Sequence, residues 1–228
     1  AADAVLAGGV DEYPEEVDRV WSGLRITARG DPASFGGPFD DRRRGFAPGE
    51  GAYLVVLETL ERARSRGAQP WAEVLAAVTR HVGAAAHRWP DDPGEVAACL
   101  RDVLLEGGLA AADLGYIAAS ANGSRALDEI EALSLRQALG RDLHRVPVTT
   151  VKGSVGESGA ASACAALVAA LSIRDGFIPP IAGLRDSAPD IGLNLVMSPR
   201  REPVSSVLVN ALGTGGSCVG LVLSRPAA

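Results

Sequence analysis

The sequence predicts an α/β fold in which helices cover both faces of a mixed sheet. From residue 52 onward, strand-like apolar runs alternate with helical patterns, and the chain closes with two apolar runs around a Gly-rich turn. With 47% hydrophobic and 22% charged residues, the composition is that of a globular protein. We treat residues 1–228 as one domain. Strands are expected at 3–7, 52–58, 71–80, 116–120, 146–151, 204–211 and 218–224, and helices at 14–21, 59–67, 93–106, 126–139 and 158–174.

The first strand has an unusual place in this order. Residues 3–7 form a continuous apolar run that ends at Gly8-Gly9, which is typical of a buried central strand. No helix or partner strand precedes it, so the pattern indicates a polypeptide that begins in the middle of a fold. We therefore expect an unpaired strand edge and no stable monomer. Residues 11–50 are rich in Gly, Pro and Asp, and a loop of that length usually serves function or an interface.

Two helices have clear local signals. Asp92 can cap a helix whose first and third positions are Pro93 and Glu95, and apolar residues then recur at helical spacing until Gly107. The helix at 158–174 is so rich in Ala that other elements must approach it closely on several faces. We expect it to be a central buried helix.

Charge and composition exclude several kinds of partner. The net charge of −6 opposes nucleic-acid binding. Three Cys and three His, far apart and without paired spacing, argue against a disulfide framework and a zinc site. The longest run of small and apolar residues, 159–173, is shorter than the ~18–20 residues that span a bilayer. We expect a cytoplasmic protein with no metal, no cofactor and no nucleic-acid or membrane partner.

Two Gly-containing turns resemble functional motifs without fulfilling them. Ser158 lies between a strand and a helix, as the nucleophile of a serine hydrolase does, but no His follows it in the chain. The turn 213–216 joins two strands, so it offers no helix N-terminus to a phosphate. We interpret both as structural turns.

Lys152 is the only Lys in a sequence that uses Arg for its other 21 basic residues. A single retained ammonium indicates a place where Arg does not fit. Lys152 follows the predicted strand 146–151, and parallel sheets collect ligand-binding groups at such strand ends. A partly buried ammonium needs a carboxylate, and the candidates are Glu131 and Glu157. We predict that Lys152 pairs with Glu131.

Seven short motifs together resemble the beta-ketoacyl synthases of fatty-acid and polyketide assembly. They follow in the order and spacing of the C-terminal half of that family, over roughly residues 2–226. The motifs are Pro38-Phe39-Asp40, RRGFAPGE (43–50) with GAYLVVLE (51–58), Arg66-Gly67-Ala68, Ala72-Glu73-Val74, KGSVG (152–156), Ile178-Pro179-Pro180 and LGTGGSC (212–218).

The resemblance implies a thiolase-like layered fold built from two similar α/β halves. In that family the nucleophilic Cys lies in the N-terminal half, and two His and one Lys come from the C-terminal half. Lys152 and Glu131 match the family pattern. The opening strand then corresponds to one that follows the Cys-bearing region, in agreement with a chain that begins in the middle of a fold.

The departures from the family concern the catalytic positions. Glu157 stands where the second catalytic His is expected. The first His position falls on Ser120 when counted back from Asp128 and Glu131, or on Asn122 when a Gly-Thr lookalike is matched. The family's Phe-containing turn, which borders the acyl tunnel, is here Leu212, Gly213, Thr214, Gly215 and Gly216.

These departures favour a subunit that does not condense. The two imidazoles stabilise the oxyanion and the enolate in the family reaction, and an anionic Glu157 would oppose an enolate. The resemblance then implies a chain-length-factor-like subunit, working with an N-terminal half, an active ketosynthase and an acyl carrier protein. The alternative is a repurposed acyltransferase in which a Cys or Ser of the partner half attacks and Glu157 or Asn122 assists. As a structural role for Glu157, we expect its carboxylate to face the positive end of the helix 158–174.

Overall fold

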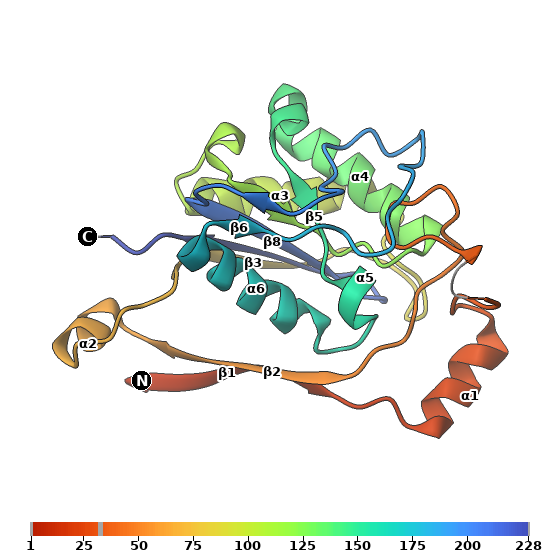
Figure 1. Cartoon of the computed structure of the whole chain (residues 1–228), viewed down its shortest axis with the longest axis horizontal. Helices are drawn as coiled ribbons and strands as arrows, with labels where there is room; N and C mark the ends of the chain where they lie inside the picture. Colours follow the sequence, from red (N-terminus) through yellow and green to blue (C-terminus); the bar gives the residue numbers. More distant parts are fainter. Residues whose placement is uncertain (1, 32–33, 228) are drawn as a thin grey trace.

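The computed structural model describes residues 2–31 and 34–227, arranged in four layers (Figure 1). Helices α3 and α4 form the first layer, a five-stranded sheet the second, α5 and α6 the third, and a two-stranded ribbon the fourth. Residues 1, 32, 33 and 228 of the predicted single domain lie outside the described residues. The helices are α1 (Glu15–Leu24), α2 (Leu60–Ser65), α3 (Pro93–Glu106), α4 (Arg125–Leu139), α5 (Lys152–Val155) and α6 (Ala161–Asp175).

The five-stranded sheet has the order β3-β9-β8-β4-β5 and is mixed. Its strands β4, β5 and β8 are parallel, whereas β9 is antiparallel to both β8 and β3. The carboxyl ends of the three parallel strands therefore meet at one edge of the sheet. The bounds are β3 (Glu73–His81), β4 (Tyr116–Ala118), β5 (Val148–Thr149), β8 (Ser206–Leu212) and β9 (Ser217–Ser224).

Helices cover both faces of this sheet, as predicted. On one face, α3 and α4 contribute Leu100, Val103 and Leu135 to the largest buried cluster. Asp92 caps α3 through a 2.8 Å hydrogen bond from the backbone N–H of Gly94, which confirms the predicted start of this helix. No helix within the described residues is long and apolar enough to cross a membrane.

Helix α6 lies between the sheet and the ribbon, so the expectation of a central Ala-rich helix is confirmed (Figure 1). Ala165 and Ala169 pack among the buried side chains of β8 and β9. On the opposite side, a Cβ at Gly9 of the ribbon would lie 3.1 Å from Cα of Ala160, just before the helix. Small residues are required on both sides because both layers pack closely against α6.

The ribbon corrects the prediction for the first strand. Strand β1 (Ala4–Asp11) continues through Gly8-Gly9 and pairs antiparallel with β2 (Gly51–Glu58). It is not a buried central strand within this chain, since Leu6 is 66% and Val10 70% exposed. The prediction missed the continuation because Gly8 was interpreted as a turn residue, whereas it extends the strand at a φ of 151°.

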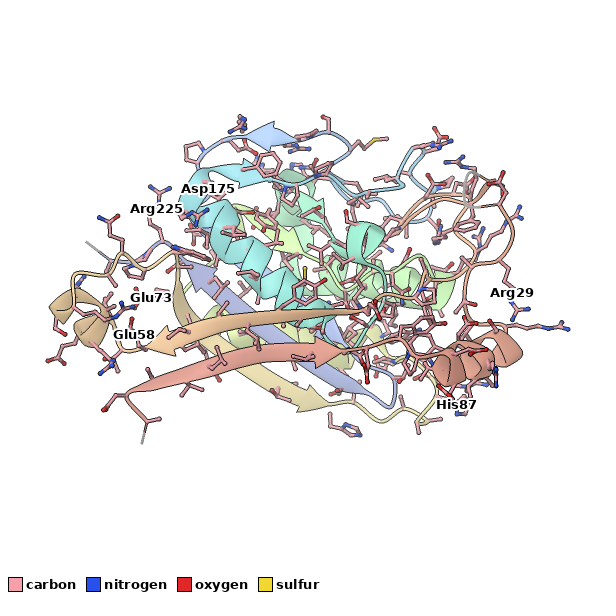
Figure 2. All side chains as sticks on the ribbon, turned by 60° about the horizontal axis from the view of Figure 1, so that its bottom comes forward. Arg29, Glu58, Glu73, His87, Asp175 and Arg225 are labelled. Atoms are coloured by element: carbon pink, nitrogen blue, oxygen red, sulfur yellow. The ribbon has the colours of Figure 1, made fainter. Side chains whose placement is uncertain are left out.

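The outer face of the ribbon is apolar and uncovered. Cross-strand partners such as Leu6 and Val56 share this face with Leu54 and Val10, and Figure 2 shows the ribbon in front of α6 with no described element in front of it. Strands with one uncovered face usually carry polar residues there. An exposed apolar face of this kind is typical of an interaction surface.

Other differences concern element ends. Helix α6 begins at Ala161 rather than 158, and β5 covers only two residues of the expected 146–151. The sequence also did not predict the short antiparallel pair of β6 (Phe177–Ile178) and β7 (Arg200–Arg201), whose strands have two residues each. Strands this short carry too little periodicity to be recognised.

Candidate functional site

Lys152 begins the short helix α5, three residues after β5. The residue is 7% exposed, and its Nζ donates to Oε2 of Glu157 at 2.9 Å and to Oγ of Ser120 at 3.3 Å. The predicted carboxylate partner is thus corrected: the ion pair of Lys152 is with Glu157 and not with Glu131. The reason is local, because the turn after α5 brings Glu157 back toward the ammonium.

Backbone hydrogen bonds fix Glu157 in this position. Its N–H donates to the carbonyl of Ala47 at 2.8 Å, and its carbonyl accepts from the N–H of Gly49 at 2.9 Å. Gly156 precedes it with a φ of 77°, and a Cβ there would lie 2.6 Å from the carbonyl oxygen of Pro48. The expected role of Glu157 as a helix cap is wrong, since α6 starts four residues later and the carboxylate binds other side chains.

Asn122 and Ser120 follow β4 and both lie in the site. Asn122 Nδ2 donates to Oε2 of Glu157 at 2.6 Å, so this oxygen accepts from an ammonium and an amide together. Ser120 Oγ accepts from Lys152 and, at 3.0 Å, from the backbone N–H of Leu212. The two alternative positions of the missing imidazole are therefore both part of one network.

Glu131 lies beneath this network on α4. It is fully buried, and its Oε1 accepts from the backbone N–H of Ser120 and from Nδ2 of Asn210, each at 2.7 Å. Burial raises the pKa of Glu131 to about 7, against the opposing effect of these hydrogen bonds. Glu131 thus positions the backbone of Ser120 rather than pairing with Lys152.

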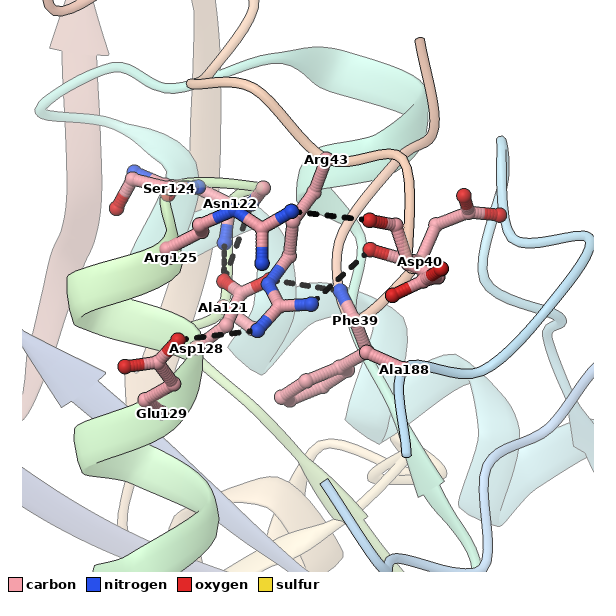
Figure 3. A network of polar contacts seen from close by, with 12 residues as sticks. Phe39, Asp40, Arg43, Ala121, Asn122, Ser124, Arg125, Asp128, Glu129 and Ala188 are labelled. Atoms are coloured by element: carbon pink, nitrogen blue, oxygen red, sulfur yellow. Dashed lines mark hydrogen bonds and ion pairs between the residues drawn. The ribbon is translucent and has the colours of Figure 1, made fainter. Parts of the chain in front are cut away.

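A buried Arg supports the loop that carries Asn122, and the sequence did not reveal it (Figure 3). Arg43 is fully buried, and its Nε lies 3.6 Å from Oδ2 of Asp128. Asp128 accepts hydrogen bonds from the backbone N–H groups of Phe39, Asn122 and Gly123, at 2.7 to 3.1 Å. Burial raises the pKa of Asp128 to about 6. Arg43 belongs to one of the quoted motifs, but the sequence predicted neither its burial nor its contact with Asp128.

Asp40 ties a further loop to the same region (Figure 3). Burial opposes its ionisation, but hydrogen bonds from Arg42 and from the backbone N–H groups of Arg185 and Asp186 outweigh this and lower its pKa to about 2. Arg43 also donates to the carbonyl of Asp40 at 3.1 Å. The segment around residue 40 is therefore an ordered support of the site.

Comparison with known proteins identifies the family. The family model described as "Beta-ketoacyl synthase, C-terminal domain" matches residues 71–185. The chain is 34% identical over 230 residues to the tetracenomycin polyketide synthase ketoacyl synthase alpha subunit of Streptomyces glaucescens, covering 99% of this chain and 54% of that protein. It is 33% identical over 235 residues to 3-oxoacyl-[acyl-carrier-protein] synthase 2 of Rhizobium meliloti, covering 98% and 54%.

The chain belongs to the beta-ketoacyl synthase family. It spans about half the length of the curated relatives that it matches. Among solved structures, the ishigamide ketosynthase/chain length factor is similar with a TM-score of 0.90 and 31% identity, over 99% of this chain and 54% of that one. The thiolase-like α/β fold and the assignment to the C-terminal half are thereby confirmed.

The network around Lys152 contains no imidazole. All three His of the sequence, His81, His87 and His144, are exposed, and His144 is bonded to the carbonyl of Arg141. What the site brings together is an ammonium, a carboxylate, an amide and a hydroxyl, at the carboxyl ends of β4, β5 and β8.

Only one end of the predicted tunnel turn reaches this network. Leu212, the last residue of β8, is buried and donates its N–H to Ser120. The remaining residues turn toward the segment 82–88: Gly215 donates to the carbonyl of Arg88 at 2.9 Å, and Val82 donates to the carbonyl of Gly216 at 2.8 Å. Gly216 must be Gly, since its φ is 95° and a Cβ would lie 1.6 Å from the oxygen of Val82.

Proposed function

We propose that this chain is the C-terminal half of a ketosynthase-like subunit that does not itself catalyse decarboxylative condensation. The observation that carries the proposal is the occupancy of Glu157 Oε2, which accepts from both Lys152 Nζ and Asn122 Nδ2. The ammonium and the amide of the site are thus both bound to a carboxylate of the protein, and the ammonium also donates to Ser120 Oγ.

Charge explains why this arrangement opposes condensation. Decarboxylation of a malonyl group creates an enolate, which a condensing site stabilises with donors aimed at the developing negative charge. Here the carboxylate of Glu157 already takes those donors. Its own charge would repel an enolate placed beside it. The site therefore supports a structural role better than a condensing one.

The same proposal includes an N-terminal half as the partner that covers the ribbon. The curated relatives are nearly twice as long as the matching region, and the outer face of β1 and β2 is apolar. A second α/β half, on this chain's own polypeptide or on a separate one, covers this outer face. Burying Leu6, Val10 and Val56 there would stabilise the assembly by roughly 1.5–3 kcal/mol for each side chain.

An active ketosynthase and an acyl carrier protein complete the proposed assembly. The similar ishigamide structure pairs a ketosynthase with a chain length factor. We assign this chain to the chain-length-factor-like role, in which the subunit shapes the acyl tunnel of its active partner. Leu212 is then the tunnel residue closest to the vestigial site, since it ends β8 and donates to Ser120.

The experiment that tests the proposal compares Glu157→Gln with the unmodified protein in the reconstituted complex. Gln keeps the shape of the side chain and an oxygen for Asn122, but it removes the charge. If Glu157 has a structural role, turnover stays unchanged. At most, the length of the product changes. Loss of turnover in a complex of normal stability would instead support the alternative acyltransferase, in which Glu157 assists a nucleophile of the partner half.

A further inference from the structure

Glu131 and Asn210 form a buried pair in which each side chain has one unmatched oxygen. Asn210 Nδ2 donates to Glu131 Oε1 at 2.7 Å. The two other oxygens of the pair, Glu131 Oε2 and Asn210 Oδ1, are both buried and have no hydrogen-bond partner. Asn210 is 2% exposed and Glu131 fully buried. Buried polar atoms are rarely left unmatched, so this coincidence needs a physical explanation.

Within residues 2–31 and 34–227, Glu131 forms no ion pair with a basic side chain, and Lys152 acts on it only through its charge, which lowers the pKa of Glu131. The ammonium of Lys152 donates its hydrogen bonds to Glu157 and Ser120. The other titratable groups that face Glu131 are Asp128 on α4, which opposes its ionisation, and Cys218 on β9. Arg43 lies against Asp128 instead. A fully buried carboxylate without an ion-pair partner is costly, so burial favours the protonated form of Glu131.

We propose that Glu131 is a neutral carboxylic acid whose proton lies on Oε2 and is donated to Oδ1 of Asn210. One proton then satisfies both unmatched oxygens, and the pair closes into a two-point acid–amide contact. Glu131 Oε1 remains free to accept from Asn210 and from the backbone N–H of Ser120. Glu131 and Asn210 are thus positioning residues, which hold Ser120 beneath Lys152 without adding charge.

The protonation state of Glu131 is independent of the proposed function. With Glu131 neutral, the ammonium of Lys152 and the carboxylate of Glu157 balance each other, and the site carries no net charge. Burial, which raises the pKa of Glu131 to about 7, acts in the same direction.

Glu131→Gln tests the proposal in the purified complex. Gln reproduces both contacts, because its oxygen can accept from Ser120 and Asn210 while its amide donates to Asn210 Oδ1. A neutral Glu131 with a raised pKa stabilises the native protein fully at low pH, and this stability is lost as the pH rises from about 4.5 through about 7. We expect Glu131→Gln to match the unmodified complex below that window and to exceed its stability above it. Destabilisation by Glu131→Gln at high pH would overturn the proposal.

Two further measurements separate the proton from a general effect on packing. Infrared difference spectra should show the carbonyl stretch of a protonated carboxylic acid that is absent from Glu131→Gln, while any band of Asp128 remains. In addition, the effects of Lys152→Met and Glu131→Gln on the free energy of unfolding should add. An ionised Glu131 that pairs with Lys152 would show no such band and would give strongly non-additive losses, and either result refutes the neutral acid.

Discussion

Replacing Lys152 with Met should destabilise the protein more than replacing Lys152 and Glu157 together. The side chains of this ion pair are 5% and 14% exposed, so solvent screens them little. Removing one partner of a buried pair costs roughly 3–5 kcal/mol, because it leaves an uncompensated charge. Asn122 still donates to Glu157 in the variant. We therefore place the loss for Lys152→Met at roughly 2–4 kcal/mol.

The double variant, with Met at 152 and Gln at 157, removes both charges and keeps the Asn122 contact. Replacing both members of a buried pair is often close to neutral, so we expect a loss of about 0–2 kcal/mol. The free energy of unfolding is measured by urea titration of the complex, with unchanged slope as the check on two-state behaviour. Arg19→Met is the control, because the Arg19–Glu15 pair is exposed and its removal should cost no more than ~1 kcal/mol. Single losses that add up to the double loss would refute the energetic pairing of Lys152 and Glu157.

Three other outcomes are expected. Glu157→His in the complex should not produce malonyl-carrier-protein decarboxylation, measured as CO₂ release, because the first imidazole position is also replaced; clear activity would place the subunit in the condensing class. Gly9→Val should lower stability by roughly 1–3 kcal/mol through overpacking against α6, whereas Gly23→Ala, which meets no atom within 4 Å, should not. This chain without an N-terminal half should bind an apolar-surface dye, and Leu6→Lys on the uncovered ribbon face should reduce that binding; equal dye binding by both proteins would count against this face as the docking surface.

Local signals in the sequence were sufficient for much of the fold. The cap at Asp92, the small residues of α6 and the Gly-rich hairpin each act within one element, and each is found as predicted. The exposure of the ribbon could not be predicted in the same way. The apolar run at 3–7 predicted a buried strand, whereas in the structure Leu6 is exposed on the outer face of the ribbon.

The partners of the site residues required the three-dimensional structure. The sequence indicated that Lys152 needs a carboxylate, and both candidates it named are close to the site. Choosing between Glu131 and Glu157 depends on how the turn after α5 is anchored to residues 47–49, which lie more than 100 residues away in the chain. The contact of Arg43 with Asp128 is long-range in the same sense, so no local pattern could have revealed it.

Backbone hydrogen bonds between residues 47–49 and Glu157 connect the ribbon directly to the site. Residues 47–49 lead directly into β2, and their hydrogen bonds hold both the N–H and the carbonyl of Glu157. A shift of β2 along its own axis would therefore move the carboxylate relative to Lys152 and Asn122. A partner that shifted β2 when it docked on the outer face of the ribbon would therefore change the geometry of the charge pair without touching either residue.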